Sequence, residues 1–159
     1  LLAGRETLGA HVWKQHNPKL GQAMVTRQSV DGVVAVIPQG DRLLVIRRSR
    51  HVVAPRQFCF PGGHLVSGES EQEGLVRELD EELQVIVQPK RRLWQSVTPW
   101  QVSLAWWLCD PIRSEPVPNP AEVESFHWLD RMELGQLSDL LESNHEFLIA
   151  WDQGEFGLF

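Results

Sequence analysis

Acidic side chains crowd into one short stretch of this sequence. Seven of its 21 acidic residues lie between positions 69 and 82, where Arg77 is the one basic residue. Among them, Glu78, Glu81 and Glu82 have the i, i+3 and i+4 spacing that places side chains on one face of a helix. Three carboxylates so close together repel one another unless a cation lies among them. Because hard oxygen ligands suit Mg²⁺ and Mn²⁺, the stretch predicts a Mg²⁺ site, with Mn²⁺ as a substitute, over a merely solvated helix face.

The residues before this stretch fit a ligand that carries phosphate. Pro61-Gly62-Gly63 lets the backbone approach a ligand closely and offers the Gly62 carbonyl to a metal ion. Arg77, four residues before Glu81, is placed to brace it by a salt bridge. Further upstream is a basic run that predicts neutralisation of phosphate oxygens: Arg47, Arg48, Arg50 and Arg56.

The acids need a helix to hold them, and residues 70–83 predict one. Leu75, Leu79 and Leu83 recur every four residues, and Ser70 with Glu73 has the spacing of a capping box. Strands are expected over residues 33–37, 43–46, 58–60, 84–87, 93–97, 102–109 and 126–129. Helices are expected over 3–16 and over 131–151, the latter broken near Ser143-Asn144. The first two strands read as a hairpin, and the order of elements favours a mixed sheet with helices on both faces, the α+β class.

Composition limits the kinds of partner. The 159 residues suit one domain, and a net charge of -6 without a basic stripe disfavours a nucleic-acid polymer. No run of 18 uncharged apolar residues predicts a membrane span. Cys59 and Cys109 lie in apolar segments without a partner motif, so we expect buried thiols and a cytoplasmic location. The oligomeric state is left open between a monomer and a homodimer.

The stretch from Gly63 to Val85 resembles the Nudix box, G-x5-E-x7-R-E-U-x-E-E-x-G-U, where U is bulky and apolar. The matching residues are Gly63, Glu69, Arg77, Glu78, Leu79, Glu81, Glu82 and Val85. A chance match to all eight is rarer than about one in a million per starting position. The one departure is Gln84, where the family has a Gly that suits a left-handed helix cap, and the departure costs about 1 kcal/mol.

This resemblance implies a fold and a set of roles. The fold is the Nudix fold, an α/β/α sandwich with a mixed β-sheet, in a single domain over 1–159 with a core at 29–152 and an N-terminal extension at 1–28. The metal ligands implied are Glu78, Glu81, Glu82, the Gly62 carbonyl and Glu122, with Glu124 as the second choice for the last. Glu69 and Arg77 are assigned to orientation, and the base is either Glu78 or Glu122. The substrate contacts implied are Arg48, Gly63, His64 and the purine-reading Asn144.

The flanking strands resemble MutT-like members, so the leading hypothesis is a hydrolase of nucleoside triphosphates, including oxidised ones, that yields a monophosphate and pyrophosphate. A second hypothesis is cleavage of another diphosphate, such as ADP-ribose, a dinucleotide or a dinucleoside polyphosphate. A third, of another class, is a catalytically silent domain that senses a nucleotide. For Trp100, Trp106 and Trp107 we expect packing ahead of stacking on a base.

Overall fold

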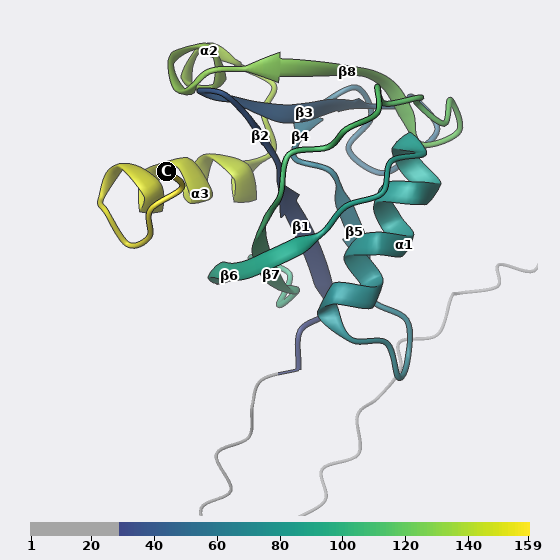
Figure 1. Ribbon diagram of the computed structural model, residues 1–159. Helices are drawn as coiled ribbons and strands as arrows, with labels where there is room; N and C mark the ends of the chain where they lie inside the picture. The colour runs from purple at the N-terminus through teal and green to yellow at the C-terminus, as the bar shows by residue number, and fades with distance from the viewer. Residues whose placement is uncertain (1–28) are drawn as a thin grey trace, which may run out of the picture.

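The computed structural model describes residues 29–159, so the helix expected over 3–16 lies outside the described residues. The strands are β1 (Gly32–Val36), β2 (Pro38–Gln39), β3 (Arg42–Arg48), β4 (Phe58–Cys59), β5 (Gly62–His64), β6 (Pro89–Val97), β7 (Ser103–Cys109) and β8 (Val123–Leu129). The helices are α1 (Glu71–Leu83), α2 (Arg131–Gln136) and α3 (Glu142–Asp152). Figure 1 shows α1 and α3 on opposite sides of β1. This is the expected α+β fold.

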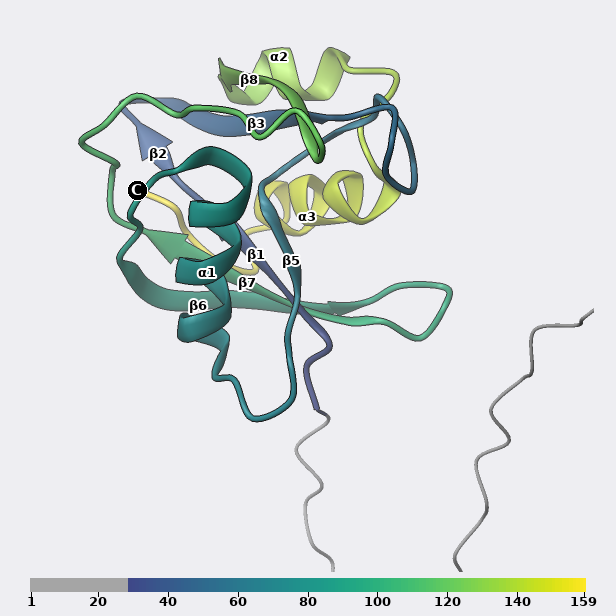
Figure 2. The same ribbon diagram turned by 90° about the vertical axis from the view of Figure 1, so that its right-hand side faces the viewer.

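Two four-stranded sheets form the middle layer. The first has the order β5-β1-β7-β6, in which β1 and β7 are parallel and the other neighbours are antiparallel. In the second, β3 pairs with β2, β4 and β8, all antiparallel. The hairpin of β6 and β7 extends beyond the rest of the fold (Figure 2). The mixed sheet that the sequence predicted is therefore confirmed.

Alternate residues of the central strands supply two separate cores. From β1, Val33 and Ala35 face the layer that holds Leu75, Leu79 and Leu83 of α1. Val34 and Val36 face the opposite layer with Phe147 of α3. Because strand side chains alternate between the two faces, one sheet anchors both helices.

Cys59 and Cys109 are free and buried, as expected. Within residues 29–159, no helix has the length and apolar character needed to cross a bilayer.

The expected hairpin is correct only at its closed end. Pro38 and Gln39 pair with Leu43 and Arg42, whereas β1 itself pairs with β5 and β7. All five residues of β1 are buried. A strand covered on both faces belongs in the middle of a sheet, and this is where β1 lies.

One of the two remaining expectations about elements is wrong, and the other is displaced by a few residues. Residues 84–87 form no strand, because within the described residues they have no partner strand. Val85 and Val87 pack on the core, and Ile86 between them is exposed. The break in the last helical region lies between α2 and α3, before Ser143-Asn144. There Leu140 bridges to Phe58, which places Asn144 in the first turn of α3.

Candidate active site

Helix α1 positions the acidic residues. Ser70 accepts a hydrogen bond from the backbone of Glu73, whose side chain bonds back to the Ser70 backbone, so the predicted capping box is present. The apolar side chains of α1 fix its rotation against the core, and this turns the neighbouring glutamates toward β5 and the segment before β8. The side chains of Glu78 and Glu81 are 13% and 49% exposed, and Glu82 is buried.

Arg77 stands at the centre of this acidic face. Its guanidinium donates to both oxygens of Glu69, at 2.7 and 2.9 Å, and to Glu78 at 2.9 Å and Glu81 at 3.2 Å. It also donates to the carbonyl of His64 at 2.9 Å. The bonds to Arg77 lower the pKa of Glu69 to about 2 and raise the pKa of Arg77. Arg77 therefore joins the loop before α1 to two of the predicted metal ligands.

Glu82 is the most enclosed of the three carboxylates. Its Oε2 accepts a hydrogen bond from the Gly62 backbone N–H at 3.1 Å. Its pKa is raised to about 8, chiefly by burial and also by the charges of Glu78 and Glu122, against the lowering effect of that hydrogen bond. Burial also raises the pKa of Glu78, whose neighbours include Glu81 and Glu122. The site thus concentrates negative charge in a place that disfavours it, which a bound cation would relieve.

Gly62 and Gly63 bring the backbone against these carboxylates. Gly62 has a φ of 153°, and a Cβ there would lie 2.1 Å from the Val33 carbonyl oxygen. A Cβ on Gly63 would lie 2.4 Å from the carboxyl carbon of Glu78. Neither position therefore tolerates a side chain without a shift, which explains the residue type at both.

Glu122 reaches the site from the segment between β7 and β8. Its charge raises the pKa of both Glu78 and Glu82, so it lies near them. Glu124, the second choice, forms an ion pair with Arg47 at 3.4 Å. The structure therefore favours Glu122 over Glu124 as the fourth acid.

Asn119, which the sequence did not indicate as a site residue, holds the segment of Glu122 in place. Its backbone N–H donates to the Glu82 carbonyl at 2.8 Å, and its Nδ2 donates to the Glu81 carbonyl at 3.3 Å. The Asn119 carbonyl accepts from the Glu122 N–H at 2.9 Å. An Asn before a Pro marks a turn in the sequence, but nothing local shows that this turn docks on the end of α1.

Arg48 lies near Glu82. Its positive charge lowers the pKa of Glu82, and its Nε donates to the Val53 carbonyl at 2.8 Å. His64 is exposed at the end of β5 and contributes its backbone carbonyl to Arg77. Both residues lie beside the acidic cluster, as expected from the sequence.

The geometry agrees with the comparison to known families. The family model described as NUDIX domain matches residues 26–151. The chain belongs to the Nudix family.

Individual relatives agree with this assignment. Over 115 residues, 72% of its length, the chain is 29% identical to the NAD-capped RNA hydrolase NudC of Stutzerimonas stutzeri (strain A1501). It spans only 38% of the length of that relative. The fold is similar to that of a MutT Nudix hydrolase from Burkholderia pseudomallei, with 21% identity, coverage of 77% of this chain and 98% of that one, and a TM-score of 0.66. The fold is also similar to that of the MutT protein of Methanosarcina mazei Go1, with 20% identity, coverage of 78% of this chain and 93% of that one, and a TM-score of 0.68.

Gln84, which departs from the Nudix box, still has the backbone conformation expected for the Gly of the box. Gln84 ends α1 with φ 53° and ψ 36°, the left-handed conformation that the sequence analysis assigned to a Gly. Its N–H bonds to the carbonyls of Asp80 and Leu79. The helix therefore ends where the box requires, in a conformation that is unfavourable for a residue with a Cβ.

Asn144 does not lie as the purine-reading role requires. Its side chain is 3% exposed, and its Oδ1 accepts from the Phe60 backbone N–H at 2.8 Å, while its Nδ2 donates to Ser143 at 3.2 Å. Both ends of the amide are thus engaged within the protein. The structure favours a positioning role for Asn144, which holds the strand that leads into Pro61-Gly62-Gly63.

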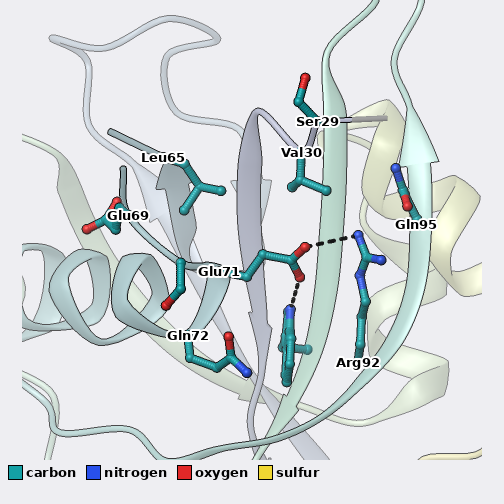
Figure 3. A pocket seen from close by; sticks show the side chains of 10 residues that line it. Ser29, Val30, Leu65, Glu69, Glu71, Gln72, Arg92 and Gln95 are labelled. Carbon is teal, nitrogen blue, oxygen red and sulfur yellow. Dashed lines mark hydrogen bonds and ion pairs between the residues drawn. The ribbon is translucent and has the colours of Figure 1, made fainter. Parts of the chain in front are cut away.

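The tryptophans named as stacking candidates lie in three different places. Trp106 is fully buried in the core beneath α3, and its indole donates to Ser96 at 2.9 Å. Trp100 is 79% exposed, in the turn between β6 and β7. Trp107 donates to Glu71 at 2.6 Å, and Glu71 also pairs with Arg92 at 3.2 Å (Figure 3). Packing is therefore confirmed for Trp106.

The bonds of Glu71 lie in a cavity of about 680 Å³ that Leu65, Glu69 and Gln95 also line (Figure 3). None of the four predicted metal-binding glutamates lines it, but the cavity adjoins the acidic face through Glu69, which lines it and bonds to Arg77.

The residues of the Nudix site fit a divalent cation by their chemistry. They offer only hard oxygen donors: the carboxylates of Glu78, Glu81, Glu82 and Glu122, and the Gly62 carbonyl. Across residues 29–159, no three His, Cys, Asp or Glu side chains stand ready to hold a metal ion as they are. One carboxylate oxygen of Glu78 and one of Glu81 accept hydrogen bonds from Arg77.

Proposed function

We propose that this Nudix chain is a Mg²⁺-dependent pyrophosphohydrolase that cleaves a nucleoside triphosphate, including an oxidised one, to a monophosphate and pyrophosphate. The observation that carries the proposal is the buried Glu82 carboxylate beside Glu78 and Glu122, with the Gly62 N–H on one oxygen and the charge of Arg48 nearby. Such a cluster of like charges is unfavourable until a cation joins it.

Each of the site residues has a separate role in the proposed reaction. A bound Mg²⁺ or Mn²⁺ would act as a Lewis acid and offset the negative charge that develops on the phosphate groups. Glu78, Glu81, Glu82 and Glu122, with the Gly62 carbonyl, would hold that ion. Glu78 or Glu122 accepts the proton of the attacking water. Arg77 and Glu69 keep the glutamates oriented, Arg48 and the backbone around Gly63 and His64 face the phosphates, and Asn144 supports that backbone from behind.

A substrate panel tests the proposal. The chain is incubated with Mg²⁺ and, separately, with ordinary and oxidised nucleoside triphosphates, ADP-ribose, NAD and dinucleoside polyphosphates, and the products are identified by chromatography. We expect turnover of a triphosphate to monophosphate and pyrophosphate, abolished by a chelator. Turnover of other diphosphates but of no triphosphate would refute the substrate assignment.

Substitutions of Glu81 and Glu82 test whether these side chains bind the metal ion. Glu82→Gln and Glu81→Gln should each lower kcat about 100-fold or more, because each removes a charged ligand. Asp80→Asn is the matched control, since Asp80 is exposed on the same helix. Full activity in both glutamine variants would show the metal assignment to be wrong. A wild-type chain that binds nucleotides and turns over none would support the nucleotide-sensing alternative.

One observation favours a second candidate function. The 29% identity to an NAD-capped RNA hydrolase is consistent with a dinucleotide substrate such as NAD. The panel separates the two candidates, since cleavage of NAD to two mononucleotides, in preference to any triphosphate, would favour the second.

A further inference from the structure

A small basic pocket lies beside the acidic cluster. It has a volume of about 270 Å³ and is formed by the loop between β3 and β4 and by the segment around Glu122. Arg50, His51 and Arg56 come from the loop, and Val123 and Glu124 come from the opposite side. The pocket therefore gathers positive charge in a chain whose net charge is -6.

The loop that carries these bases is held in shape by its own hydrogen bonds. The N–H of Arg56 donates to the Arg48 carbonyl at 3.0 Å, so the loop closes on the strand it leaves. From inside the loop, Arg48 Nε binds the Val53 carbonyl. The N–H of His51 donates to Ser49 Oγ at 3.0 Å. A pocket with a fixed backbone binds a ligand at a smaller entropic cost than a loose loop does.

The same loop is joined to the acidic cluster. The Ser49 N–H donates to the Glu122 carbonyl at 2.9 Å, and its Oγ donates to the Ala121 carbonyl at 3.0 Å. The same segment is bound to α1, because the Glu122 N–H donates to the Asn119 carbonyl at 2.9 Å and the Asn119 N–H donates to the Glu82 carbonyl at 2.8 Å. The basic pocket therefore lies next to the place proposed for the pyrophosphate group.

Two arginines of this pocket have no acidic partner. Arg47 pairs with Glu124 and Asp139, and Arg48 lies near Glu82. Within the described part of the chain, no carboxylate lies within 4 Å of the guanidinium of Arg50 or Arg56. Arg50 instead lies beside another base, with its Nε 3.5 Å from His51 Nε2. Planar guanidinium groups without a carboxylate partner are well suited to bind phosphate.

We infer that Arg50 and Arg56 bind the terminal phosphate of a nucleoside triphosphate while the acidic cluster engages the bond to be cleaved. This inference rests on the proposed function and deepens it, since the pocket would favour three linked phosphates over two. A diphosphate joined to a sugar would leave the two guanidinium groups without a ligand.

The inference is tested by binding of two analogues that cannot be cleaved between the α and β phosphates. The probes are guanosine 5′-(α,β-methylene)triphosphate and the corresponding diphosphate, titrated calorimetrically into the full chain with Mg²⁺. Loss of charge-assisted hydrogen bonds in Arg50→Ala/Arg56→Ala should raise the Kd of the triphosphate about 10-fold or more. The Kd of the diphosphate should change less than about 2-fold, since it does not reach the pocket.

Two further variants serve as controls. Arg50→Lys/Arg56→Lys keeps the charge and should recover part of the triphosphate affinity. Arg42→Ala removes an exposed arginine at the other end of β3 and should change neither Kd.

Equal weakening of both analogues, an unchanged preference in the alanine variant, or no binding of the triphosphate to the wild-type chain would overturn the inference. Its failure is distinguishable from that of the proposed function. If the wild-type enzyme is active but its preference for triphosphate over diphosphate does not depend on Arg50 and Arg56, only the inference about the pocket is refuted. If the chain cleaves no pyrophosphate bond, the proposed function is refuted.

Discussion

At the scale of single residues, Glu82 occupies surroundings that oppose its own charge. The side chain lies beneath Gly62 and beside two other acids, and burial is the largest cause of its raised pKa. In the metal-free chain at neutral pH the carboxyl therefore holds a proton that a solvent-exposed glutamate would have lost. Binding of a cation by this group must displace the proton, which couples metal affinity to pH.

The raised pKa of Glu82 predicts how stability depends on pH. The pKa is about 8 in the folded chain and 4.5 in its ordinary state, so between these values the folded chain binds more protons than the unfolded one. Stability that is present below pH 4.5 is therefore lost as the pH rises through 8. In the presence of a chelator, we expect the Tm to fall between pH 5 and pH 8.5, by about 2–4 °C for each 1 kcal/mol of destabilisation.

The Glu82→Gln variant checks the source of this effect, because an amide does not titrate. Its Tm should fall less over the same range in differential scanning calorimetry, and added Mg²⁺ at pH 8.5 should raise the Tm of the wild-type chain more than that of the variant. An identical slope in both proteins would show that Glu82 does not cause the dependence.

The sequence predicted which acids share a face but not how differently they are placed. Spacing along a helix gives the direction of each side chain around the axis. The surroundings of Glu82, however, include Gly62, Asn119 and Arg48, and each of these lies outside α1. Asn144 shows the same limit, since its engagement with Phe60 arises from a contact across 84 positions.

At the scale of elements, the two ends of α1 differ in how well their residues suit them. Its first turn has a complete capping box at Ser70. At its last turn, Gln84 takes the left-handed conformation that favours Gly, and Val117 and Asn119 donate to the carbonyls of Leu83 and Glu82. The loop thus satisfies carbonyls that a helix end leaves free, and the strain at Gln84 stays local.

Replacement of Gln84 should therefore stabilise the chain. In Gln84→Gly the Cβ that clashes in the left-handed conformation is gone, and we expect a gain of about 1 kcal/mol in the free energy of unfolding. Urea denaturation followed by circular dichroism measures it. Gln84→Ala, which keeps the Cβ, should give no such gain. A loss of stability in the glycine variant would mean that the Gln84 side chain makes contacts worth more than the strain it causes.

Elements with a strong local pattern were predicted, and those decided by distant partners were not. The leucine spacing and capping box of α1 are local, and α1 begins and ends as predicted. The alternation of Val85 and Val87 is also local, but a strand needs a partner strand, and within residues 29–159 none pairs with them. The break before α3 was predicted a few residues too late in the chain because its cause, the bridge between Leu140 and Phe58, joins segments about 80 residues apart.

At the scale of the whole molecule, the active site and the aromatic core lie on opposite faces of shared strands. β1 and β7 send alternate side chains into both cores, so the layer beneath α1 and the layer beneath α3 have the same backbone. Phe147 of α3 stacks on Trp106 and Phe156, with ring centroids 4.6 and 4.8 Å apart, and meets Phe60 edge-on at 5.4 Å. Phe60 in turn directly precedes Pro61-Gly62-Gly63 of the site.

This shared backbone predicts that the described domain unfolds as one unit. Phe147→Ala should cost about 3–5 kcal/mol, because it leaves a cavity among aromatic rings that cannot close around it. Tryptophan fluorescence and far-ultraviolet circular dichroism should still report one coincident transition, and Leu79→Ala on the other face should lower the same transition. If the two layers folded separately, each variant would shift only one of two transitions. One transition for both variants would mean that the acidic face of α1 keeps its geometry only while the aromatic layer behind the sheet remains packed.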